Sequence, residues 1–584
     1  VMLHLRKIAL FLAVVFCISL AGCSADAPQS KAAGSIDQTA VYRQNSASQQ
    51  TQNLAKLCKV WGYAKYYHPA FLLGTSDWDA ELLSLLSKVS ACETSDDVNA
   101  LLHEWFTSLG EIDYKARIPK AASGSDASVS EADLSWTADA DYLGEALVGD
   151  LAKLPTMLPT NLDRTHAPVF FDSLGVPDFS NEPEHGSDYT DPDFRLLGLF
   201  RLWNALDYYA PYLHLLDCDW DAVLLEAIPT MLDGTDRESY EAALASVTGE
   251  LQDAHVWWSS TVEGTKLSYR ANPGGYYLPV PVSDVGGQLV VTGTADNCPL
   301  EKGDVLVSID GETIDELAAE KKPYYSLPRE DMLLTNAWRA IVNSETETME
   351  VVVRRGGEEC SFSVTGSEHS VSHTKSVLNG LDAFQVVGGN IGVLNPGVLE
   401  SETELCNAME ELRNTDALII DLRQYSGVMG LYFYIPTSYQ PAIVVAKPNA
   451  ATPGTFTKDP ISCGYDSSLL TYSQSYYPYE KPVVILMDKN SVSRSEYLIT
   501  ILKQADNVTV IGEASTGADG NVAFLPLPGE LQLQFTSFGI YEMDGAQTQC
   551  TGIQPDVAVH YTAEGIREGR DEIMEAALNR LRRS

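Results

Sequence analysis

The chain has 584 residues, of which 45% are hydrophobic, 20% charged and 9% aromatic, so it can form several sizeable cores. Eighty acidic against 39 basic side chains give a formal net charge of −41. This charge argues against nucleic acid as a partner, since phosphate binding needs a basic surface, and against a domain held on anionic lipid by charge alone.

Residues 1–22 have the pattern of a lipoprotein signal peptide. Two basic residues precede an apolar stretch of 13 residues, which is too short to span a membrane comfortably. The stretch ends in Leu20-Ala21-Gly22-Cys23, which resembles a bacterial lipobox and implies cleavage before Cys23 and lipid on its thiol. An ordinary secretory signal or an uncleaved anchor is the alternative. We expect residues 23–50, which are small and polar, to be a flexible tether that holds an extracytoplasmic body on a membrane.

Two stretches resemble each other at a constant offset of 142 residues, which predicts a duplicated helical module. Each reads as a helix, an aromatic-Pro turn and a second helix, and further helices are predicted at 94–109 and 236–253. We assign residues 51–115 to the first copy and 191–262 to the second, with 116–190 between them read as mostly loop. The identities are Trp61 with Trp203, Tyr66 with Tyr208, Tyr67 with Tyr209, Pro69 with Pro211, Trp78 with Trp220 and Asp79 with Asp221.

Residues 270–370 change character. Short β-rich runs surround one predicted helix near 314–321. The segment Leu300-Glu-Lys-Gly-Asp-Val-Leu-Val-Ser-Ile-Asp-Gly311 resembles the core of a PDZ domain. That resemblance implies a β domain that binds an extended peptide along a sheet edge, and a purely structural domain with a closed groove is the alternative.

Residues 375–584 alternate strand and helix. The runs IGVLNPG, ALIIDLR, PVVILMD and VTVIGE are typical of buried strands, and helices are predicted at 402–413, 494–505 and 568–582. This pattern indicates an α/β core with a partly parallel sheet. The predicted fold class of the whole chain is therefore multidomain α+β.

Two residues stand out as candidates for nucleophilic chemistry. Ser493 follows a buried strand and precedes an amphipathic helix, where backbone N–H groups can stabilise an oxyanion. Ser493 and Glu496 also fit a capping box, which is the structural alternative. A serine nucleophile needs a base, and His255 lies where the second helical module ends and a strand is expected to begin. A lone histidine is more often structural.

Five motifs in one order resemble the C-terminal-processing (tail-specific) and tricorn-core serine peptidases of clan SK. The resemblance covers about residues 195–584 and implies a crotonase-like ββα catalytic core. The motifs are Leu251-Gln-Asp253-Ala-His255, Ile419-Ile-Asp421-Leu-Arg423-Gln-Tyr-Ser-Gly427, Ser493-Arg-Ser-Glu496, Val510-Ile-Gly512-Glu513 and Gly552-Ile-Gln-Pro555-Asp556.

Departures from the family pattern bear on the mechanism. The processing proteases place a lysine about 25 residues after the serine, and this chain has Ala518 there, so a Ser–Lys dyad is not expected. The tricorn-like branch uses a histidine base, which implies Ser493 as nucleophile and His255 as general base. Ser495 is the alternative nucleophile.

The supporting residues of the family are matched less well. The resemblance implies an oxyanion hole from the backbone N–H of Arg494 and that of Gly427 or Val428, where the family has a second glycine. An acidic residue that orients the histidine is expected just before G-V-x-P-D. That place holds Gln549, with Glu542 and Asp544 further upstream.

We therefore expect a lipid-anchored, extracytoplasmic serine endopeptidase that acts on a peptide or protein substrate and needs no cofactor. No HExxH motif or clustered His and Cys set predicts a metal site. A degenerate peptidase that binds peptides without turnover is the first alternative, and a structural surface lipoprotein is the second. The sequence does not determine the oligomeric state.

Overall fold

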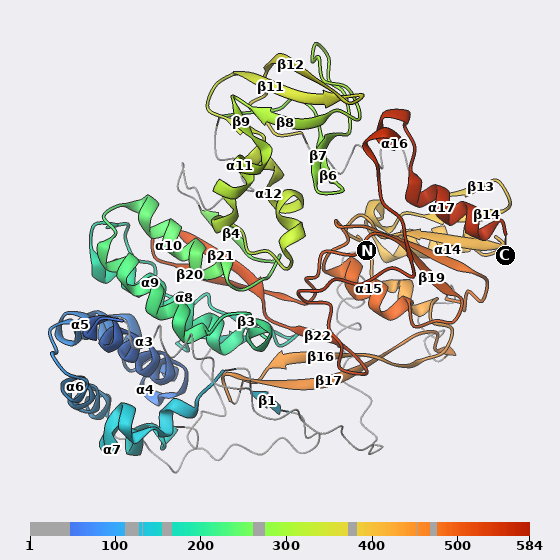
Figure 1. The fold of residues 1–584 in the computed structure, drawn as a ribbon. Coiled ribbons are helices and arrows are strands. Elements are labelled where there is room, and N and C mark those ends of the chain that lie inside the picture. Colours follow the sequence, from blue (N-terminus) through green and yellow to red (C-terminus); the bar gives the residue numbers. More distant parts are fainter. Residues whose placement is uncertain are drawn as a thin grey trace.

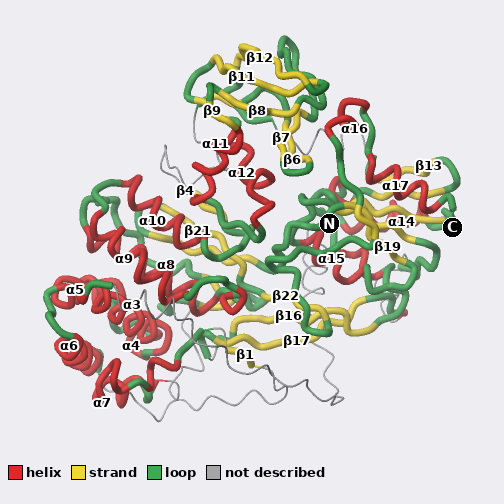
Figure 2. Tube along the Cα trace, in the orientation of Figure 1, coloured by secondary structure: helices red, strands yellow, loops and turns green. Residues whose placement is uncertain are grey.

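The computed structural model describes residues 47–110, 128–130, 132–154, 166–260, 275–371, 382–450, 452–467 and 476–583. A helical region, a β-rich unit and a core built on a parallel sheet follow one another along the chain (Figures 1 and 2). The predicted mixed α+β class is confirmed. The proposed signal peptide, most of the tether and Cys23 lie outside the described residues. No helix in the described part combines the length and apolar character that a bilayer crossing requires.

Two similar runs of helices make up the helical region. The turns after Tyr67 and Tyr209 and the N-caps Asp77 and Asp219 match the predicted helix, turn and helix in both stretches. The first run holds α3 (Gln49–Tyr67), α4 (Pro69–Leu72), α5 (Trp78–Ser90) and α6 (Ser95–Ser108), and the second holds α8 (Pro192–Tyr209), α9 (Trp220–Asp233) and α10 (Arg237–Gly249).

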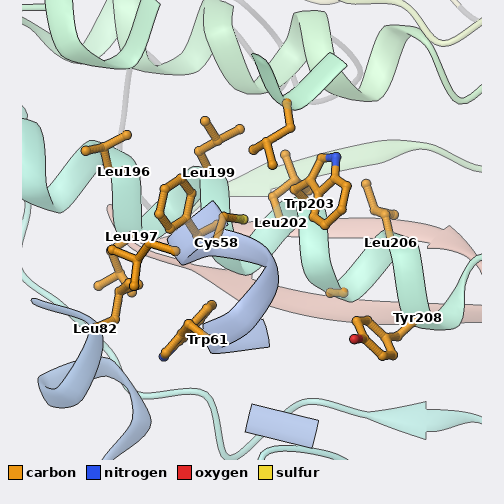
Figure 3. Packing of buried hydrophobic residues seen from close by; sticks show 14 of the residues in the cluster. Cys58, Trp61, Leu82, Leu196, Leu197, Leu199, Leu202, Trp203, Leu206 and Tyr208 are labelled. Atoms are coloured by element: carbon orange, nitrogen blue, oxygen red, sulfur yellow. The ribbon is translucent and has the colours of Figure 1, made fainter. Parts of the chain in front are cut away.

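Equivalent residues of the two runs meet where α3 crosses α8. A Cβ at Gly62 would overlap the Asn204 side chain, and these positions differ by the same 142 residues. One contact also recurs in both copies: Trp61 Nε1 donates to the Trp78 carbonyl (2.7 Å), and Trp203 Nε1 to the Trp220 carbonyl (3.0 Å). Trp61 and Trp203 belong to one buried cluster (Figure 3). These contacts support the duplication, which stays a prediction.

The connecting segment 116–190 contains more helix than its composition predicts. Helix α7 (Ala140–Leu151) lies within it and buries Leu143, Leu147 and Leu151, which are spaced four residues apart on one face. Two glycines in this segment weaken the helical signal, and Gly144 has a φ of 76° at a kink. The expectation of a mostly loop segment was wrong for residues 140–151.

A small sheet brings the end of the second helical run to the C-terminal part of the chain. Its strand order is β20 (Val522–Leu527), β21 (Leu531–Thr536) and β4 (Trp257–Ser260), all antiparallel. Leu525, Leu533 and Trp258 bury their side chains in the same core as the helices. The residues just before β4 therefore lie beside the end of β21.

The β-rich unit is an antiparallel sheet with two helices. Its strand order is β12 (Glu358–Thr365), β11 (Thr348–Arg355), β8 (Val305–Ile309), β7 (Gln288–Val291) and β6 (Val282–Val285), with β9 (Glu312–Thr313) paired to β8. Helix α11 (Ile314–Lys321) lies where it was predicted, whereas α12 (Leu333–Ile341) was missed. The PDZ identity of this unit stays a prediction. Short strands β5 (Tyr276–Tyr277) and β10 (Asn343–Ser344) pair separately, as do β2 (Phe170–Phe171) and β3 (Pro177–Asp178) in the helical region.

The C-terminal core contains the predicted partly parallel sheet. The strand order is β13 (Phe384–Val387), β14 (Ile391–Leu394), β15 (Ala417–Asp421), β18 (Val483–Met487), β19 (Val508–Gly512) and β23 (Val557–Ala558). The last five of these strands are parallel, whereas β13 pairs antiparallel to β14. Its helices are α14 (Glu402–Leu412), α15 (Arg494–Leu502), α16 (Ala563–Glu568) and α17 (Glu572–Leu581).

A long hairpin, which was not predicted, connects this core to the helical region (Figure 1). Tyr67 donates its hydroxyl hydrogen to the carbonyl of Pro453 at the hairpin tip (2.6 Å), and Gly454 N donates to the Tyr208 carbonyl (3.2 Å). The hairpin strands β16 (Gln440–Pro448) and β17 (Thr455–Cys463) lie between β22 (Gly539–Glu542) and β1 (Ser128–Ser130).

Candidate active site

The serine turn, which we define as residues 488–497, joins β18 to α15 at the carboxyl end of the parallel sheet. Ser493 is the residue before α15 and has φ 55° and ψ −119°, which is unusual for a residue with a Cβ. Such a conformation costs on the order of 1–3 kcal/mol and persists only where the surroundings enforce it. Ser493 N donates to the carbonyl of Ala518 (2.9 Å), and this hydrogen bond ties the turn to the chain at Ala518.

The carboxylate of Glu496 fixes the serine turn through hydrogen bonds. Its buried carboxylate accepts hydrogen bonds from Ser493 N (3.3 Å), Gly517 N (2.8 Å), Ala518 N (2.9 Å) and the Ser515 hydroxyl. Burial raises the pKa of Glu496 to about 7, against the opposing effect of these hydrogen bonds. The Glu496 half of the predicted capping box is therefore present, and it also joins the turn to the segment 515–518.

Ser495 is not arranged as a nucleophile. It is fully buried, its Oγ donates to the Gln424 carbonyl (2.8 Å), and it accepts from Ser426 N (3.2 Å). Both hydrogen-bonding roles of the hydroxyl are used to fix the loop after β15 against α15. The alternative nucleophile of the sequence analysis is therefore a structural residue here.

Two of the three predicted oxyanion-hole donors have other partners. Gly427 N donates to the Pro396 carbonyl (3.0 Å), and Val428 N donates to the Ser426 hydroxyl (3.3 Å). The Val428 side chain is buried in the core, which accounts for a large residue where the family has glycine. Both N–H groups thus have partners in this structure, and their role in an oxyanion hole stays a prediction. The N–H of Arg494, in the first turn of α15, is the remaining predicted donor.

The histidine segment, which we define as residues 251–256, places His255 just before β4. His255 is 8% exposed, and its Nε2 is buried with no hydrogen-bond partner among the described residues. Its Nδ1 lies 2.8 Å from the Thr536 hydroxyl and 3.5 Å from Asp253 Oδ1. One imidazole nitrogen is thus held by side chains, while the other has no partner in the part of the chain that the structure describes.

The histidine segment and the serine turn both border the segment 518–520. Thr536, which holds His255, packs against Gly520, where an added Cβ would lie 3.2 Å from the threonine methyl carbon. Gly520 follows Ala518 by two residues, and Ala518 accepts the hydrogen bond from Ser493 N. The fold therefore gathers the two predicted catalytic residues, 238 positions apart in the chain, around the segment 518–520.

None of the predicted orienting residues is the partner of the imidazole. Gln549 is buried, but its Nε2 donates to the Gln252 carbonyl (3.0 Å), three residues before His255. Glu542 pairs with Lys503 (2.8 Å). Asp544 is exposed in a turn and accepts from Ala546 N (3.0 Å). The imidazole thus contacts Thr536 and none of these three residues.

Sequence reasoning missed Asp253 and Thr536 as neighbours of the histidine. The Asp253 signal was available, because an aspartate two residues before a histidine can accept that residue's backbone N–H, as it does here (2.9 Å). Thr536 is 281 residues away and lies in no recognised motif, so only the fold could identify it.

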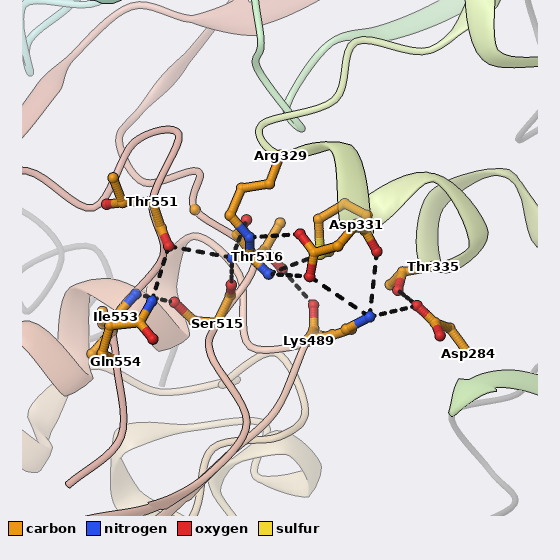
Figure 4. Close-up of polar contacts among 12 residues, drawn as sticks. Asp284, Arg329, Asp331, Thr335, Lys489, Ser515, Thr516, Thr551, Ile553 and Gln554 are labelled. Carbon is orange, nitrogen blue, oxygen red and sulfur yellow. Dashed lines mark hydrogen bonds and ion pairs between the residues drawn. The ribbon is translucent and has the colours of Figure 1, made fainter. Parts of the chain in front are cut away.

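The β-rich unit contacts the segment beside the serine turn through Arg329 (Figure 4). The Arg329 guanidinium donates to the carbonyls of Ser515 and Thr516, and Ser515 in turn donates to Glu496. Nearby, Lys489 of the serine turn pairs with Asp284 of β6 (2.7 Å). A pocket that is partly open to solvent lies along this boundary and is lined by residues that include Asp284, Asp488 and Lys489, but not by Ser493 or His255.

The C-terminal core matches a known peptidase family. Residues 390–559 match peptidase family S41. The carboxy-terminal processing protease CtpB of Bacillus subtilis (strain 168) is 22% identical over 345 residues, which cover 56% of this chain and 64% of that protein. A carboxy-terminal-processing protease of Bartonella bacilliformis is 32% identical over 80 residues, covering 14% and 18%. The chain thus spans less than two thirds of the length of either relative.

A solved structure shares the fold over a longer stretch. The crystal structure of mature CPAF covers 67% of this chain and 96% of its own, with a TM-score of 0.52 and 15% sequence identity. This likeness shows a shared fold. The match over residues 390–559 shows a peptidase family S41 domain in that part of the chain, and the sequence similarity shows homology to the carboxy-terminal processing proteases.

Proposed function

We propose that the protein is a serine endopeptidase that hydrolyses peptide bonds through an acyl-enzyme, with Ser493 as nucleophile and His255 as general base. One observation carries the proposal: a serine in a strained conformation at a helix N-terminus and a buried histidine, whose Nε2 has no partner in the described part of the chain, both border the segment 518–520. The S41 match supports a serine-type peptidase, and a peptide or protein is the substrate class.

The chemistry follows from these positions. The Ser493 Oγ attacks the scissile carbonyl carbon while its proton passes to His255 Nε2. The N–H of Arg494 donates to the oxyanion, helped by the positive end of the α15 dipole. The C–N bond then breaks, and Nε2 returns the proton to the leaving amine. Water activated by the same nitrogen hydrolyses the ester and restores the Ser493 hydroxyl.

The location belongs to the proposal as well. The sequence Leu20-Ala21-Gly22-Cys23 supports a lipid on Cys23 and an extracytoplasmic body held on a membrane. Metabolic labelling with a fatty acid analogue tests this, since Cys23→Ala should abolish incorporation. Incorporation that persists in this variant would contradict the proposed lipid site.

A peptide-binding protein without turnover is the second candidate. It is favoured by the engagement of the Gly427 and Val428 N–H groups, which leaves one predicted donor for an oxyanion. A closed donor set lowers turnover, because removing a single oxyanion donor costs about 10²–10³-fold in rate in a known serine protease.

An activity probe separates the two candidates. The purified chain is treated with a fluorophosphonate, beside Ser493→Ala, Ser495→Ala and His255→Ala, and mass spectrometry locates the adduct. We expect labelling at Ser493 that is abolished by the first variant, reduced at least 100-fold by His255→Ala, and not relocated by Ser495→Ala. Peptide binding in a folded wild-type sample that does not label would favour the second candidate.

A further inference from the structure

We propose that Thr536 and Asp253 are the positioning residues of His255: the threonine hydroxyl bridges the imidazole to the carboxylate and fixes the hydrogen on Nδ1. This pair takes the place of the acidic residue that is absent at Gln549. The assignment of the tautomer stands on geometry alone, whereas its consequence for catalysis rests on the proposed function.

The hydrogen-bond donors determine the direction of the bridge. Asp253 Oδ1 is 2.9 Å from the Thr536 hydroxyl, and an ionised carboxylate can only accept. The single hydroxyl hydrogen of Thr536 therefore points to Asp253, since otherwise two acceptors would face each other. The Thr536 oxygen then accepts from Nδ1 (2.8 Å), so Nδ1 carries the hydrogen and Nε2 presents a lone pair.

Asp253 is held as a carboxylate by several donors. It accepts from Thr536 N (2.8 Å) and from His255 N (2.9 Å) in addition to the threonine hydroxyl. Burial alone would raise the pKa of Asp253, but the neighbouring His255 ring and the backbone N–H donors of Thr536 and His255 lower it below its usual range. A buried negative charge 3.5 Å from Nδ1 stabilises the imidazolium that forms when Nε2 takes a proton.

His68 provides an internal contrast. Its Nε2 is also buried without a partner in the described part of the chain, but its Nδ1 accepts from Ala70 N (3.1 Å) and caps α4. The hydrogen of neutral His68 therefore lies on Nε2, which cannot act as a base. The two histidines thus differ in the groups around Nδ1, and at His255 these groups are Thr536 and Asp253.

The first test observes the tautomer and needs no activity. The full chain is prepared with ¹⁵N-labelled histidine, and His255 is assigned by comparison with His255→Gln. We expect a protonated Nδ1 and an unprotonated Nε2 in neutral His255. Thr536→Val keeps the backbone N–H that binds Asp253 but removes the hydroxyl, so both nitrogens should move toward averaged shifts. Thr536→Ala serves where the valine disturbs packing.

The second test measures fluorophosphonate labelling of the same variants. We expect Thr536→Val to slow labelling about 10–100-fold and Thr536→Ser to stay within about threefold of the wild type. Thr548→Val is the matched control, because this threonine is also buried but its hydroxyl has no partner among the described residues. It should leave both the tautomer and the labelling rate unchanged.

The outcomes separate this inference from the proposed function. A hydrogen on Nε2 in the wild type, or an unchanged tautomer in Thr536→Val and Thr536→Ala, would overturn the bridge even if the protein labels. A tautomer that shifts as expected in a protein that never labels would keep the bridge and reject the peptidase. A slower Thr536→Val that Thr536→Ser does not restore would overturn the catalytic role of the hydroxyl.

Discussion

The serine turn and the histidine segment are held by different kinds of contact. Glu496 fixes the serine turn mainly through backbone N–H groups, so the support depends on the path of the chain at 493–518. The histidine segment is fixed by side chains, since the ring itself contacts the Thr536 hydroxyl. The hydrogen bonds from backbone N–H groups to Glu496 tolerate changes of neighbouring side chains but not the loss of Glu496 itself. The contact that holds His255 is lost when one hydroxyl, that of Thr536, is removed.

Removing the acceptor of the serine turn should have the largest effect. Glu496→Ala leaves the buried N–H groups of Gly517 and Ala518 and the Ser515 hydroxyl without their acceptor, which we expect to cost about 5 kcal/mol of unfolding free energy. Labelling of Ser493 should fall more than 100-fold. Denaturant unfolding and the fluorophosphonate measure the two effects.

Asp97→Ala is the matched control for this variant. Asp97 accepts from Thr94 N in the capping box of α6, far from the site, so its loss should cost about 1 kcal/mol and leave labelling unchanged. A Glu496→Ala protein that labels at the wild-type rate would show that the hydrogen bonds to Glu496 do not position Ser493.

The pH dependence of the unfolding free energy tests the protonation of Asp488, the first residue of the serine turn. Burial, with the nearby charges of Glu513 and Asp421, raises the pKa of Asp488 to about 7, against the opposing charge of Arg423. Since the folded state holds this proton more tightly than the unfolded chain, the group stabilises the fold at low pH. That contribution is lost as the pH rises from about 4 to about 7.

We expect Asp488→Asn to remove this dependence, because the amide mimics the protonated acid. The stability of the variant relative to the wild type should be about zero at pH 4 and about 4 kcal/mol at pH 8, by thermal or denaturant unfolding. A difference that stays constant from pH 4 to pH 8 would mean that Asp488 does not titrate in this range.

The sequence names the two candidate residues, Ser493 and His255, but not the contacts that hold them in place. The motifs around Ser493 and His255 are local, and the strand and helix patterns that position them are strong, so β14, β15, β18, β19 and α15 could be anticipated. Thr536 and the hairpin β16–β17 act through contacts between distant parts of the chain, which leave no local pattern. Val428 marks a glycine position of the family, yet only the structure shows the neighbouring N–H groups engaged.

Restoring the acid of the family pattern tests which residue supports the histidine. Gln549→Glu replaces the amide that donates to the Gln252 carbonyl with a carboxylate facing the same oxygen, so we expect a loss of about 2 kcal/mol. Labelling should fall rather than rise. An increase of more than about threefold would show that the absent acid limits the reaction and would contradict the role of Thr536.

The smallest effect is expected for a residue that the family pattern also suggested. Glu542 is partly exposed and pairs with Lys503 at 2.8 Å, and exposed ion pairs contribute little because water and salt screen them. Glu542→Gln should therefore cost about 0.5 kcal/mol and leave labelling of Ser493 unchanged. Lys503→Gln and the double variant complete a cycle that isolates the pair in denaturant unfolding. A labelling rate reduced tenfold by Glu542→Gln, but not by Lys503→Gln, would show that Glu542 supports the histidine, as the family pattern suggested.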